Sequence, residues 1–329
     1  MDREHGQRWR GGVPDIPRRC AGGYHNQCHH FCRHRPRRFH HLHVPSYRHD
    51  AAGNISASST SATATTTGAV TFDSATTAWV NAVIAAGGTV SSTQEGYVDT
   101  LIKGLKADGV WSSLDRLWLY AGESSAQQAQ IDIKSLASGT AHGGLTLGAA
   151  GYTGDGSTGY FDTNFNPTTA GGNFSASSAS FGVYDRTNNT SNGYGGATVG
   201  QYDGSYDVSL YPWTGAPQVS YDLNDSNYSS YSGAGDTTTQ GFWMVNLLSS
   251  TVYLDKNGSN LKSNASGSTG LINNDITVFA LNSTSSGVIG FITDQLAASF
   301  IGGGLTPTQR TDLSSRLNAY MTALGINVF

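Results

Sequence analysis

Residues 152–167 read YTGDGSTGYFDTNFNP, and this stretch indicates the fold more clearly than any other part of the chain. A Gly-Asp-Gly turn comes first, and aromatic residues then alternate with small polar ones. Alternation with a period of two is the pattern of a strand with one buried face, and Gly-Asp-Gly favours a tight turn. The stretch therefore predicts the first hairpin of a two-sheet β-sandwich.

Further strand patterns follow, with turn signals between them. Ala179, Phe181 and Val183 alternate with small or polar residues, and the run 242–248 is apolar on both faces, as a central strand would be. Asn257–Gly258 supplies the positive φ angles of a tight hairpin turn. The number of short strands favours a mainly β, antiparallel sandwich or jelly roll. Other strands are expected at 114–120, 145–147, 208–210, 251–255, 276–281, 288–292 and 296–301.

Helical periodicity precedes the strands. Apolar residues return every three to four positions after Ser74, and again after Ser92 or Thr93, either of which could cap a second helix. The two stretches are separated by a short Gly-rich loop. We therefore expect a helical hairpin within residues 71–110, whose apolar stripes are core contacts.

The chain closes with a second helical signal. Thr306 as N-cap, Pro307 at the first helical position and Gln309 as capping-box partner predict a helix over 307–324. Its apolar face should pack on the sandwich, so that residues 111–329 form a jelly roll with a C-terminal packing helix.

Charge divides the chain near Asp50. The first fifty residues hold ten of the nineteen Lys and Arg, nine of the ten His and all three Cys. Residues 51–329 therefore contain nine basic and nineteen acidic residues, a net charge of about −10. Such a body should repel nucleic acid.

Residues 1–50 are open to several interpretations. The Cys and His residues could ligate zinc, although their spacing matches no usual zinc site, and the basic run 33–39 could attract phosphates. The segment also lacks the apolar periodicity needed to fold. We interpret it as disordered or as an artefact of a wrong start site or reading frame, and residues 51–70 as a Ser/Thr/Ala-rich linker.

No targeting or membrane segment is expected. The basic N-terminus is not followed by the apolar core of a secretory signal, and no stretch reaches the eighteen apolar residues of a membrane span. The sequence therefore predicts a protein made in the bacterial cytoplasm, with no membrane partner.

Several motifs occur in an order that resembles concanavalin A-like, laminin-G-like jelly rolls. They are the 152–156 turn with Tyr160-Phe-Asp, SASFGVY (178–184), TVYLDKNGS (251–259) and FIGGGLTPTQ (300–309). The resemblance implies the sandwich fold. Thr153–Gly154 stands where that family has Phe before Asp-Gly, and the acidic calcium ligands of some relatives are not matched. We expect no cofactor, and calcium is the one metal that the resemblance leaves open.

More narrowly, GLKADGVWSSLDRLWLYA (104–121) together with the 152–157 turn is similar to tail-associated proteins of bacteriophages and prophages. This resemblance covers roughly residues 71–326 and implies a virion structural protein. Its partners would be other virion proteins or its own copies in a homo-oligomer. After assembly it would lie on the virion, at an extracellular surface.

Catalytic motifs are absent from the predicted sandwich. The chain has three glutamates, Glu4, Glu95 and Glu123, and none lies in the strand region, so the paired glutamates of glycosidases on this fold are missing. His142 is the only histidine after residue 50, and no nucleophile elbow or phosphate-binding loop accompanies it. Aspartate pairs such as Asp203/Asp207 and Asp222/Asp225 are more often turn formers. We therefore expect no enzymatic activity.

Tyrosines mixed with Asp and Asn between residues 202 and 231 form the candidate binding surface. Aromatic faces pack on sugar rings, and Asp and Asn groups bond hydroxyls, so this composition suits a glycan. By alternation Tyr211 and Trp213 share the face opposite Val208 and Leu210, and we expect them to be exposed contacts. The expected ligand-binding residues are Tyr211, Trp213, Asp207, Tyr206 and Asp203.

The sequence thus predicts a non-enzymatic virion protein with a jelly-roll module for attachment or for binding a bacterial surface glycan or receptor. Two alternatives remain open. The tyrosines could pack inside the sandwich or between copies of a purely structural assembly subunit, or the fold could carry a carbohydrate-active enzyme.

Overall fold

The computed structural model divides the chain into two compact units, Met1–Val70 and Thr71–Phe329. In the first unit two short strands, β1 (Leu42–His43) and β2 (Thr63–Ala64), pair antiparallel. Almost all of the basic segment 1–50 lies outside the described residues. The structure describes β1, β2 and residues 50–57, 71–189, 198–212, 218–226, 229–232, 238–267 and 269–329.

The second unit is a sandwich of two sheets, as predicted. We call them the inner sheet, in the order β15–β14–β13–β8–β19–β6–β5 with β3 also paired to β19, and the outer sheet, in the order β12–β11–β10–β9–β16–β7–β4. In the outer sheet β17 pairs with β18 and, in parallel, with β9. All the other strand pairs are antiparallel.

The inner-sheet strands are β3 (Leu114–Leu119), β5 (Thr146–Gly148), β6 (Gly151–Thr153), β8 (Ser178–Asp185), β13 (Gly241–Leu248), β14 (Thr251–Lys256), β15 (Ser259–Ala265) and β19 (Gln295–Gly302). The outer-sheet strands are β4 (Thr140–His142), β7 (Tyr160–Asp162), β9 (Val199–Tyr202), β10 (Asp207–Tyr211), β11 (Gln218–Asp225), β12 (Ser229–Ser232), β16 (Thr277–Val278), β17 (Leu281–Ser283) and β18 (Gly287–Ile289).

The central strands of the inner sheet are buried on both faces, which explains why β13 is apolar on both of its faces. Trp243, Val245 and Leu247 belong to the core between the two sheets, while Phe242 and Met244 belong to a second core beneath the helices. Because side chains alternate along a strand, such a strand needs apolar residues on both of its faces.

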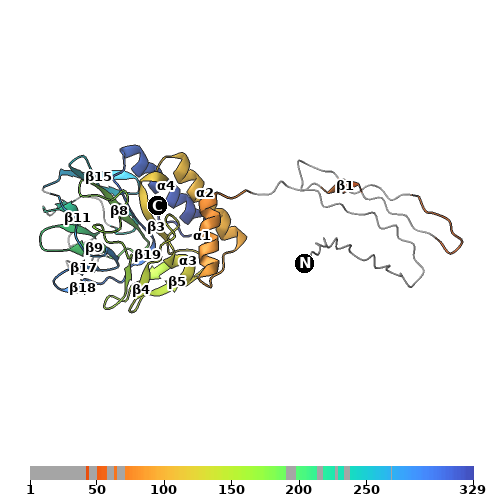
Figure 1. Ribbon diagram of the computed structural model, residues 1–329, viewed down its shortest axis with the longest axis horizontal. Coiled ribbons are helices and arrows are strands. Elements are labelled where there is room, and N and C mark those ends of the chain that lie inside the picture. Colours follow the sequence, from red (N-terminus) through yellow and green to blue (C-terminus); the bar gives the residue numbers. More distant parts are fainter. Residues whose placement is uncertain are drawn as a thin grey trace, which may run out of the picture. The chain divides into compact units, whose positions relative to one another are not determined.

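Helices α1, α2 and α4 cover the face of the inner sheet that is turned away from the outer sheet (Figure 1), whereas Ala129 of α3 belongs to the core between the sheets. The helices are α1 (Ser74–Ala85), α2 (Ser92–Ala107), α3 (Ala126–Gln130) and α4 (Pro307–Ala323), with a 3₁₀ turn at Trp111–Ser113. The α4 capping box of Thr306 and Gln309 is confirmed. The N-cap of α2 is Ser91, one residue before the predicted start, because its Oγ accepts from the Gln94 N–H. Among the described residues no helix is long and apolar enough to cross a membrane.

The stretch 152–167 is not a hairpin, which corrects the sequence prediction. β6 pairs with β5 and β19 in the inner sheet, whereas β7 pairs with β4 and β16 in the outer sheet. The Asp155 carboxylate accepts N–H groups of Ser157, Thr158 and Gly159 at 2.7–2.9 Å and so shapes the turn between the two sheets. The motif is therefore an arch that joins the layers, and Phe161 after it is fully buried.

Two of the predicted strands are shorter than expected. The pattern over 276–281 is broken between β16 and β17 at Phe279, which has a φ of 73° and is fully buried. The pattern over 288–292 ends with β18 at Ile289, because Gly290 has a φ of 66°. Positive φ angles leave the extended region, so each strand stops there.

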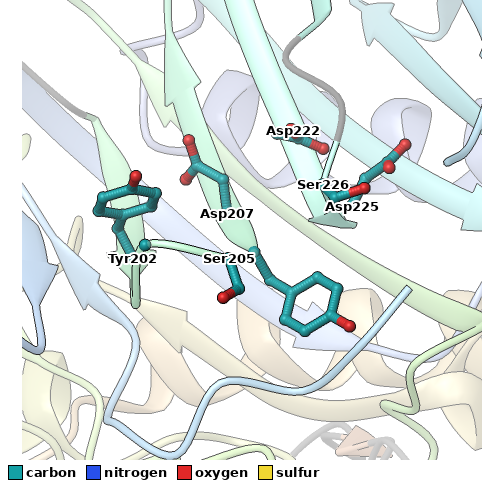
Figure 2. Close-up of a pocket in the computed structure, with 8 residues that line it drawn as sticks. Tyr202, Ser205, Asp207, Asp222, Asp225 and Ser226 are labelled. Carbon is teal, nitrogen blue, oxygen red and sulfur yellow. The ribbon is translucent and has the colours of Figure 1, made fainter. Parts of the chain in front are cut away.

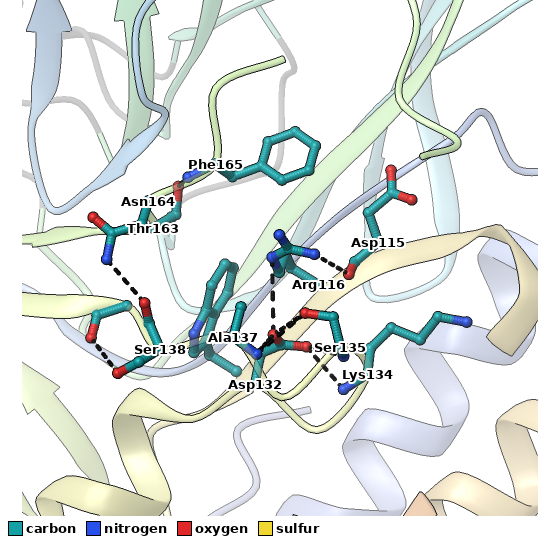
Figure 3. A network of polar contacts seen from close by, with 12 residues as sticks. Asp115, Arg116, Asp132, Lys134, Ser135, Ala137, Ser138, Thr163, Asn164 and Phe165 are labelled. Carbon is teal, nitrogen blue, oxygen red and sulfur yellow. Dashed lines mark hydrogen bonds and ion pairs between the residues drawn. The ribbon is translucent and has the colours of Figure 1, made fainter. Parts of the chain in front are cut away.

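A buried carboxylate after α3 shows how this unit satisfies charge in its interior (Figure 3). Asp132 is fully buried and accepts the backbone N–H groups of Lys134, Ser135 and Ala137 at 2.7–3.0 Å, as well as the Ser135 hydroxyl at 2.6 Å. Arg116 Nε lies 3.8 Å from its second oxygen. Burial raises the pKa of Asp132, and the surrounding donors oppose that rise.

Candidate ligand-binding site

A pocket of about 190 Å³ lies at the edge of the outer sheet where β9, β10 and β11 end or begin. Because these strands are antiparallel neighbours, the end of β9, the start of β10 and the end of β11 meet at the same edge. Figure 2 shows their side chains around the pocket. The described lining residues are Tyr202, Gly204, Ser205, Tyr206, Asp207, Asp222, Asp225 and Ser226.

The turn between β9 and β10 positions the two tyrosines. Asp203 accepts the N–H groups of Ser205 and Tyr206 at 2.7 and 2.8 Å, and Gly204 supplies a φ of 89°. An aspartate that bonds the backbone two and three residues ahead is a common turn former. Tyr202 is 39% exposed on one side of the turn, and Tyr206 is half-buried on the other.

A β-bulge in β11 brings two aspartates to the same face of the sheet. Asp222 and Asp225 are three residues apart, so in a regular strand they would point to opposite faces. The strand register shifts between Asp207 and Val208, so that Asp225 lies opposite Asp207, and Asn224 adopts a φ of 57°. The inserted residue places Asp222 and Asp225 together beside Asp207.

The carboxylates of the pocket are poorly solvated. Burial raises the pKa of Asp207 to about 7. Burial, followed by the charge of Asp207, raises the pKa of Asp222 to about 9. Asp225 is 1% exposed, and both of its oxygens accept the Gly267 N–H at 2.8 Å. At neutral pH Asp222 is therefore protonated and Asp207 lies near the midpoint of its titration.

Hydroxyls beside these carboxylates are buried without partners. Ser209 lies on the pocket face of β10 opposite Asp222, close enough to Asp207 to favour its charged form. Even so, Ser209 Oγ makes no hydrogen bond of good geometry, and neither does the buried Oδ1 atom of Asp207. Buried polar atoms normally have partners, so these atoms mark a place where a ligand could bond.

The predicted contact residues lie in different places. Tyr206 and Asp207 line the pocket, while Asp203 supports the turn beside it. Tyr211 is half-buried at the far end of β10. Trp213 lies outside the described residues.

Six of the eight lining residues are not among the predicted contacts, and Tyr202, Asp222 and Asp225 are three of these six. A signal for them exists in the sequence, because residues 187–255 contain six aspartates but no Lys, Arg or His.

Metal and histidine chemistry have little support at this site. In the part of the chain that the structure describes, no group of three or more His, Cys, Asp and Glu side chains is arranged to hold a metal ion. His142 lies on β4, at the end of the outer-sheet order opposite β12, and its ring stacks on Tyr160 at 4.6 Å. It is therefore not part of the pocket.

Comparison with known proteins gives likenesses of fold at low identity. No family model and no curated protein matches the chain. One matching structure is of botulinum neurotoxin type C, whose cell entry depends on interaction with two ganglioside molecules (13% identity, TM-score 0.45, covering 64% of this chain and 53% of that chain). The chain spans about half, 52%, of the length of the type D toxin binding domain that it also matches.

Two carbohydrate-related structures match to a similar degree. One is a Trypanosoma rangeli sialidase mutant with trans-sialidase activity (10% identity, TM-score 0.46, covering 69% of this chain and 40% of that chain). The other is domain 4 of the arabinanase AbnA from Geobacillus stearothermophilus in complex with arabinotriose (19% identity, TM-score 0.37, covering 61% and 100%). At these identities and TM-scores the likenesses concern the fold alone.

Proposed function

We propose that the unit Thr71–Phe329 is a non-enzymatic binding module that recognises a glycan in the pocket at the edge of the outer sheet. The observation that carries this proposal is the joint presence of two tyrosines and three aspartates around one cavity. The exposed ring of Tyr202 offers an apolar face to the C–H surface of a sugar. The aspartate oxygens accept hydrogen bonds from its hydroxyls.

Glycan binding can be tested with arrayed bacterial surface polysaccharides, followed by calorimetric titration of those that bind. Tyr202→Ala should weaken binding by about 3- to 10-fold, the worth of one aromatic contact. Tyr97→Ala on α2 removes a half-buried tyrosine from the helix-covered side and is the matched control. Equal affinities of wild type and Tyr202→Ala would contradict the assignment of the pocket.

The setting that we propose is the surface of a bacteriophage or prophage virion, with other virion proteins or further copies of the chain as partners. The support is the sequence resemblance of residues 71–326 to tail-associated proteins. Mass spectrometry of purified particles from an induced host should recover peptides of this unit, and their absence would contradict the setting. A stable oligomer that binds no polysaccharide would favour a purely structural assembly subunit.

A carbohydrate-active enzyme is a second candidate, because two carboxylates of different pKa share the pocket. Protonated Asp222 could donate a proton to a glycosidic oxygen, and ionised Asp207 could act as a base or nucleophile. Incubation with the bound polysaccharide would then release reducing ends, and Asp222→Asn would abolish that release. Binding without release supports the non-enzymatic module.

A further inference from the structure

A second surface of the outer sheet carries three aromatic rings in a row. His142 on β4 and Tyr160 on β7 are cross-strand partners, and their rings stack with centroids 4.6 Å apart. The ring of Phe291, which follows β18, lies 6.3 Å from the ring of Tyr160. We call these three rings the aromatic row. Each of them is half-buried, so part of each ring is open to solvent.

The aromatic row and the pocket share one face of the outer sheet, the face that is turned away from the core. Phe161, the residue after Tyr160, is fully buried in the core between the sheets. Because side chains alternate along a strand, Tyr160 points away from the core, and so does its cross-strand partner His142. Tyr202 at the pocket lies on the same face, since Val199, three residues before it, belongs to the core.

The distance between the aromatic row and the pocket is longer than one sugar residue. β16 pairs with both β7 and β9 and places Phe161 level with Val199. Because β7 and β9 run in the same direction, Tyr160 lies one residue before that level and Tyr202 three residues beyond it. A strand rises ~3.3 Å per residue, so the two tyrosines are roughly 13 Å apart along the strands. A ligand that contacts both must be a chain.

The β17–β18 hairpin runs between the pocket and the aromatic row. At its pocket end Ser283 pairs with Tyr202, and the Thr284 N–H donates to the Tyr202 carbonyl at 2.9 Å. β18 then returns along β17 and leads to Phe291 in the aromatic row. Ile289, two residues before Phe291, is 41% exposed. The hairpin therefore joins the two sites and presents an exposed apolar side chain between them.

Uncharged groups dominate the surface along this hairpin. Residues 276–293 contain no Asp, Glu, Lys, Arg or His, and the hydroxyl-bearing hairpin tip 284–286 is exposed. Aromatic and aliphatic groups pack on the C–H faces of sugar rings, and hydroxyl groups bond sugar hydroxyls. Asp162 lies two residues after Tyr160 on the same face, so an anionic chain would meet like charge there. An uncharged glycan chain therefore matches this surface.

We propose that the aromatic row is a second subsite for a glycan whose end sugar occupies the pocket, so that the module recognises an extended, uncharged chain. This inference rests on the proposed glycan-binding function and names the class of glycan. The pocket volume of about 190 Å³ lies below the ~300–1,000 Å³ of sites that enclose drug-sized ligands, so the pocket holds one sugar residue. The glycan leaves the pocket at Tyr202, follows the hairpin past Ile289 and packs against the aromatic row.

The test compares two chain lengths. Disaccharides and hexasaccharides of glucose, galactose, mannose and N-acetylglucosamine are titrated calorimetrically at pH 7. For a sugar that binds, the hexasaccharide should bind about 10-fold more tightly than the disaccharide, as expected for two aromatic contacts beyond the pocket. Equal affinities of the two lengths would overturn the second subsite while glycan binding stands. If none of these oligosaccharides binds to the folded protein, the glycan-binding proposal fails together with it.

Substitutions along the hairpin and the aromatic row should weaken binding of the hexasaccharide and leave binding of the disaccharide unchanged. His142→Ala should weaken hexasaccharide binding about 3- to 10-fold, the worth of one ring contact, and Ile289→Ser about 3-fold. Ile84→Ser on α1 replaces an isoleucine that is 56% exposed on the helix-covered side, so this matched control should change neither affinity. Equal weakening of both chain lengths by His142→Ala or Ile289→Ser would overturn the proposed path.

Hydroxyl-radical labelling of the unchanged protein gives a second measurement that needs no variant. The hexasaccharide should protect both Tyr202 and the aromatic row from labelling, whereas the disaccharide should protect Tyr202 and leave the row labelled. Protection of Tyr202 alone by the hexasaccharide would overturn the second subsite. A row that is already protected without saccharide, and becomes labelled when the protein is diluted, would mean that further copies of the chain cover it, and this result would also overturn the proposal.

Discussion

The helix-covered side of the sandwich and the edge of the outer sheet bury charge in opposite ways. Beneath α4, Asp255 is 2% exposed and receives two hydrogen bonds of 2.8 Å from Arg310 Nη1. At the pocket, Asp207 and Asp222 face each other's charge with no cation beside them among the described residues. Within the described residues, seven of the twelve buried side-chain atoms without a hydrogen bond lie between Thr198 and Asn224.

This difference distinguishes carboxylates that stabilise the fold from carboxylates that are available to a ligand. The carboxylates of Asp255 and Asp132 accept hydrogen bonds from Arg310 and from four donors near Asp132, so both carboxylates are satisfied inside the fold. Buried acceptors without partners lower the stability of the fold. Proteins keep such acceptors mainly at functional sites, where a ligand can bond them. The pocket edge has the character of a site, and the helix-covered side that of a scaffold.

The largest expected effect is on the scaffold side. Arg310→Met removes the partner of Asp255 and leaves a buried carboxylate unpaired, which should lower the free energy of unfolding by about 3–5 kcal/mol. Urea unfolding followed by circular dichroism measures the change. The double variant Arg310→Met/Asp255→Leu should recover most of the loss. If Arg310→Met lowers the free energy of unfolding by less than about 1 kcal/mol, then the partner of Asp255 contributes little, and the proposed difference between the helix-covered side and the pocket is wrong.

Replacing a buried carboxylate of the pocket should raise the free energy of unfolding instead of lowering it, and the size of this gain should depend on pH. Asp222 has a folded-state pKa of about 9, above its ordinary value of 3.8, so the folded protein holds this proton more tightly than the unfolded chain. Its contribution to stability is fully present below pH 4 and is lost as the pH rises toward 9. Asp222→Asn should therefore stabilise the protein at pH 8 by about 2 kcal/mol, or about 5 °C in Tm, and much less at pH 4.

Asp132→Asn is the matched control for that prediction. Asp132 is also buried, but its carboxylate accepts four hydrogen bonds, so its replacement should destabilise the protein at both pH values. Thermal unfolding at pH 4 and pH 8 measures both variants. Destabilisation by Asp222→Asn at pH 8 would show that this carboxylate has structural partners and would weaken the case for a ligand site.

Local chemistry in the sequence predicted the scaffold well and the pocket poorly. The Thr306 capping box depends on residues within one helical turn, and the Asn257–Gly258 turn depends on its own φ angles of 53° and 78°, so both could be predicted. The 152–167 stretch has the composition of a hairpin, but β6 pairs with β19, far along the chain. Strand partners at such separation leave no local pattern.

The sequence predicted Tyr206 and Asp207 as contacts, but the meeting of Asp222 and Asp225 beside them escaped prediction for a related reason. Strand alternation assigns Asp222 and Asp225 to opposite faces, and only the bulge at Asn224 unites them. That bulge is held by a hydrogen bond from Asn224 Nδ2 to the Ser175 carbonyl at 3.0 Å, a contact across forty-nine residues. What the sequence does contain is the basic-free stretch from Thr187 to Asp255, which predicts an acidic surface without naming its contacts.

A smaller effect is expected at the N-terminus of α4, where the capping box supplies hydrogen-bond partners to backbone N–H groups. Thr306 Oγ1 accepts the Gln309 N–H at 3.3 Å, and Gln309 Oε1 accepts the Thr306 N–H at 3.0 Å. Thr306→Ala should lower the free energy of unfolding by about 1 kcal/mol. Thr306→Ser keeps the acceptor and is the control. Equal destabilisation by both substitutions would assign the effect to packing of the threonine methyl group.

The smallest expected effect is at an exposed ion pair, and it tests whether an Arg–Asp pair stabilises the fold only when it is buried. Arg316 on α4 donates to Asp108 at 2.6 and 3.1 Å, with geometry as good as that of Arg310, but 42% of its side chain is exposed. Because water screens an exposed pair, Arg316→Ala should cost less than about 1 kcal/mol in urea unfolding, and salt should reduce the difference further. A loss equal to that of Arg310→Met would mean that pairing alone stabilises this side. The carboxylates of Asp207 and Asp222 would then lower stability because they lack a cationic partner and not because they are buried, and Asp222→Asn would lose its expected gain.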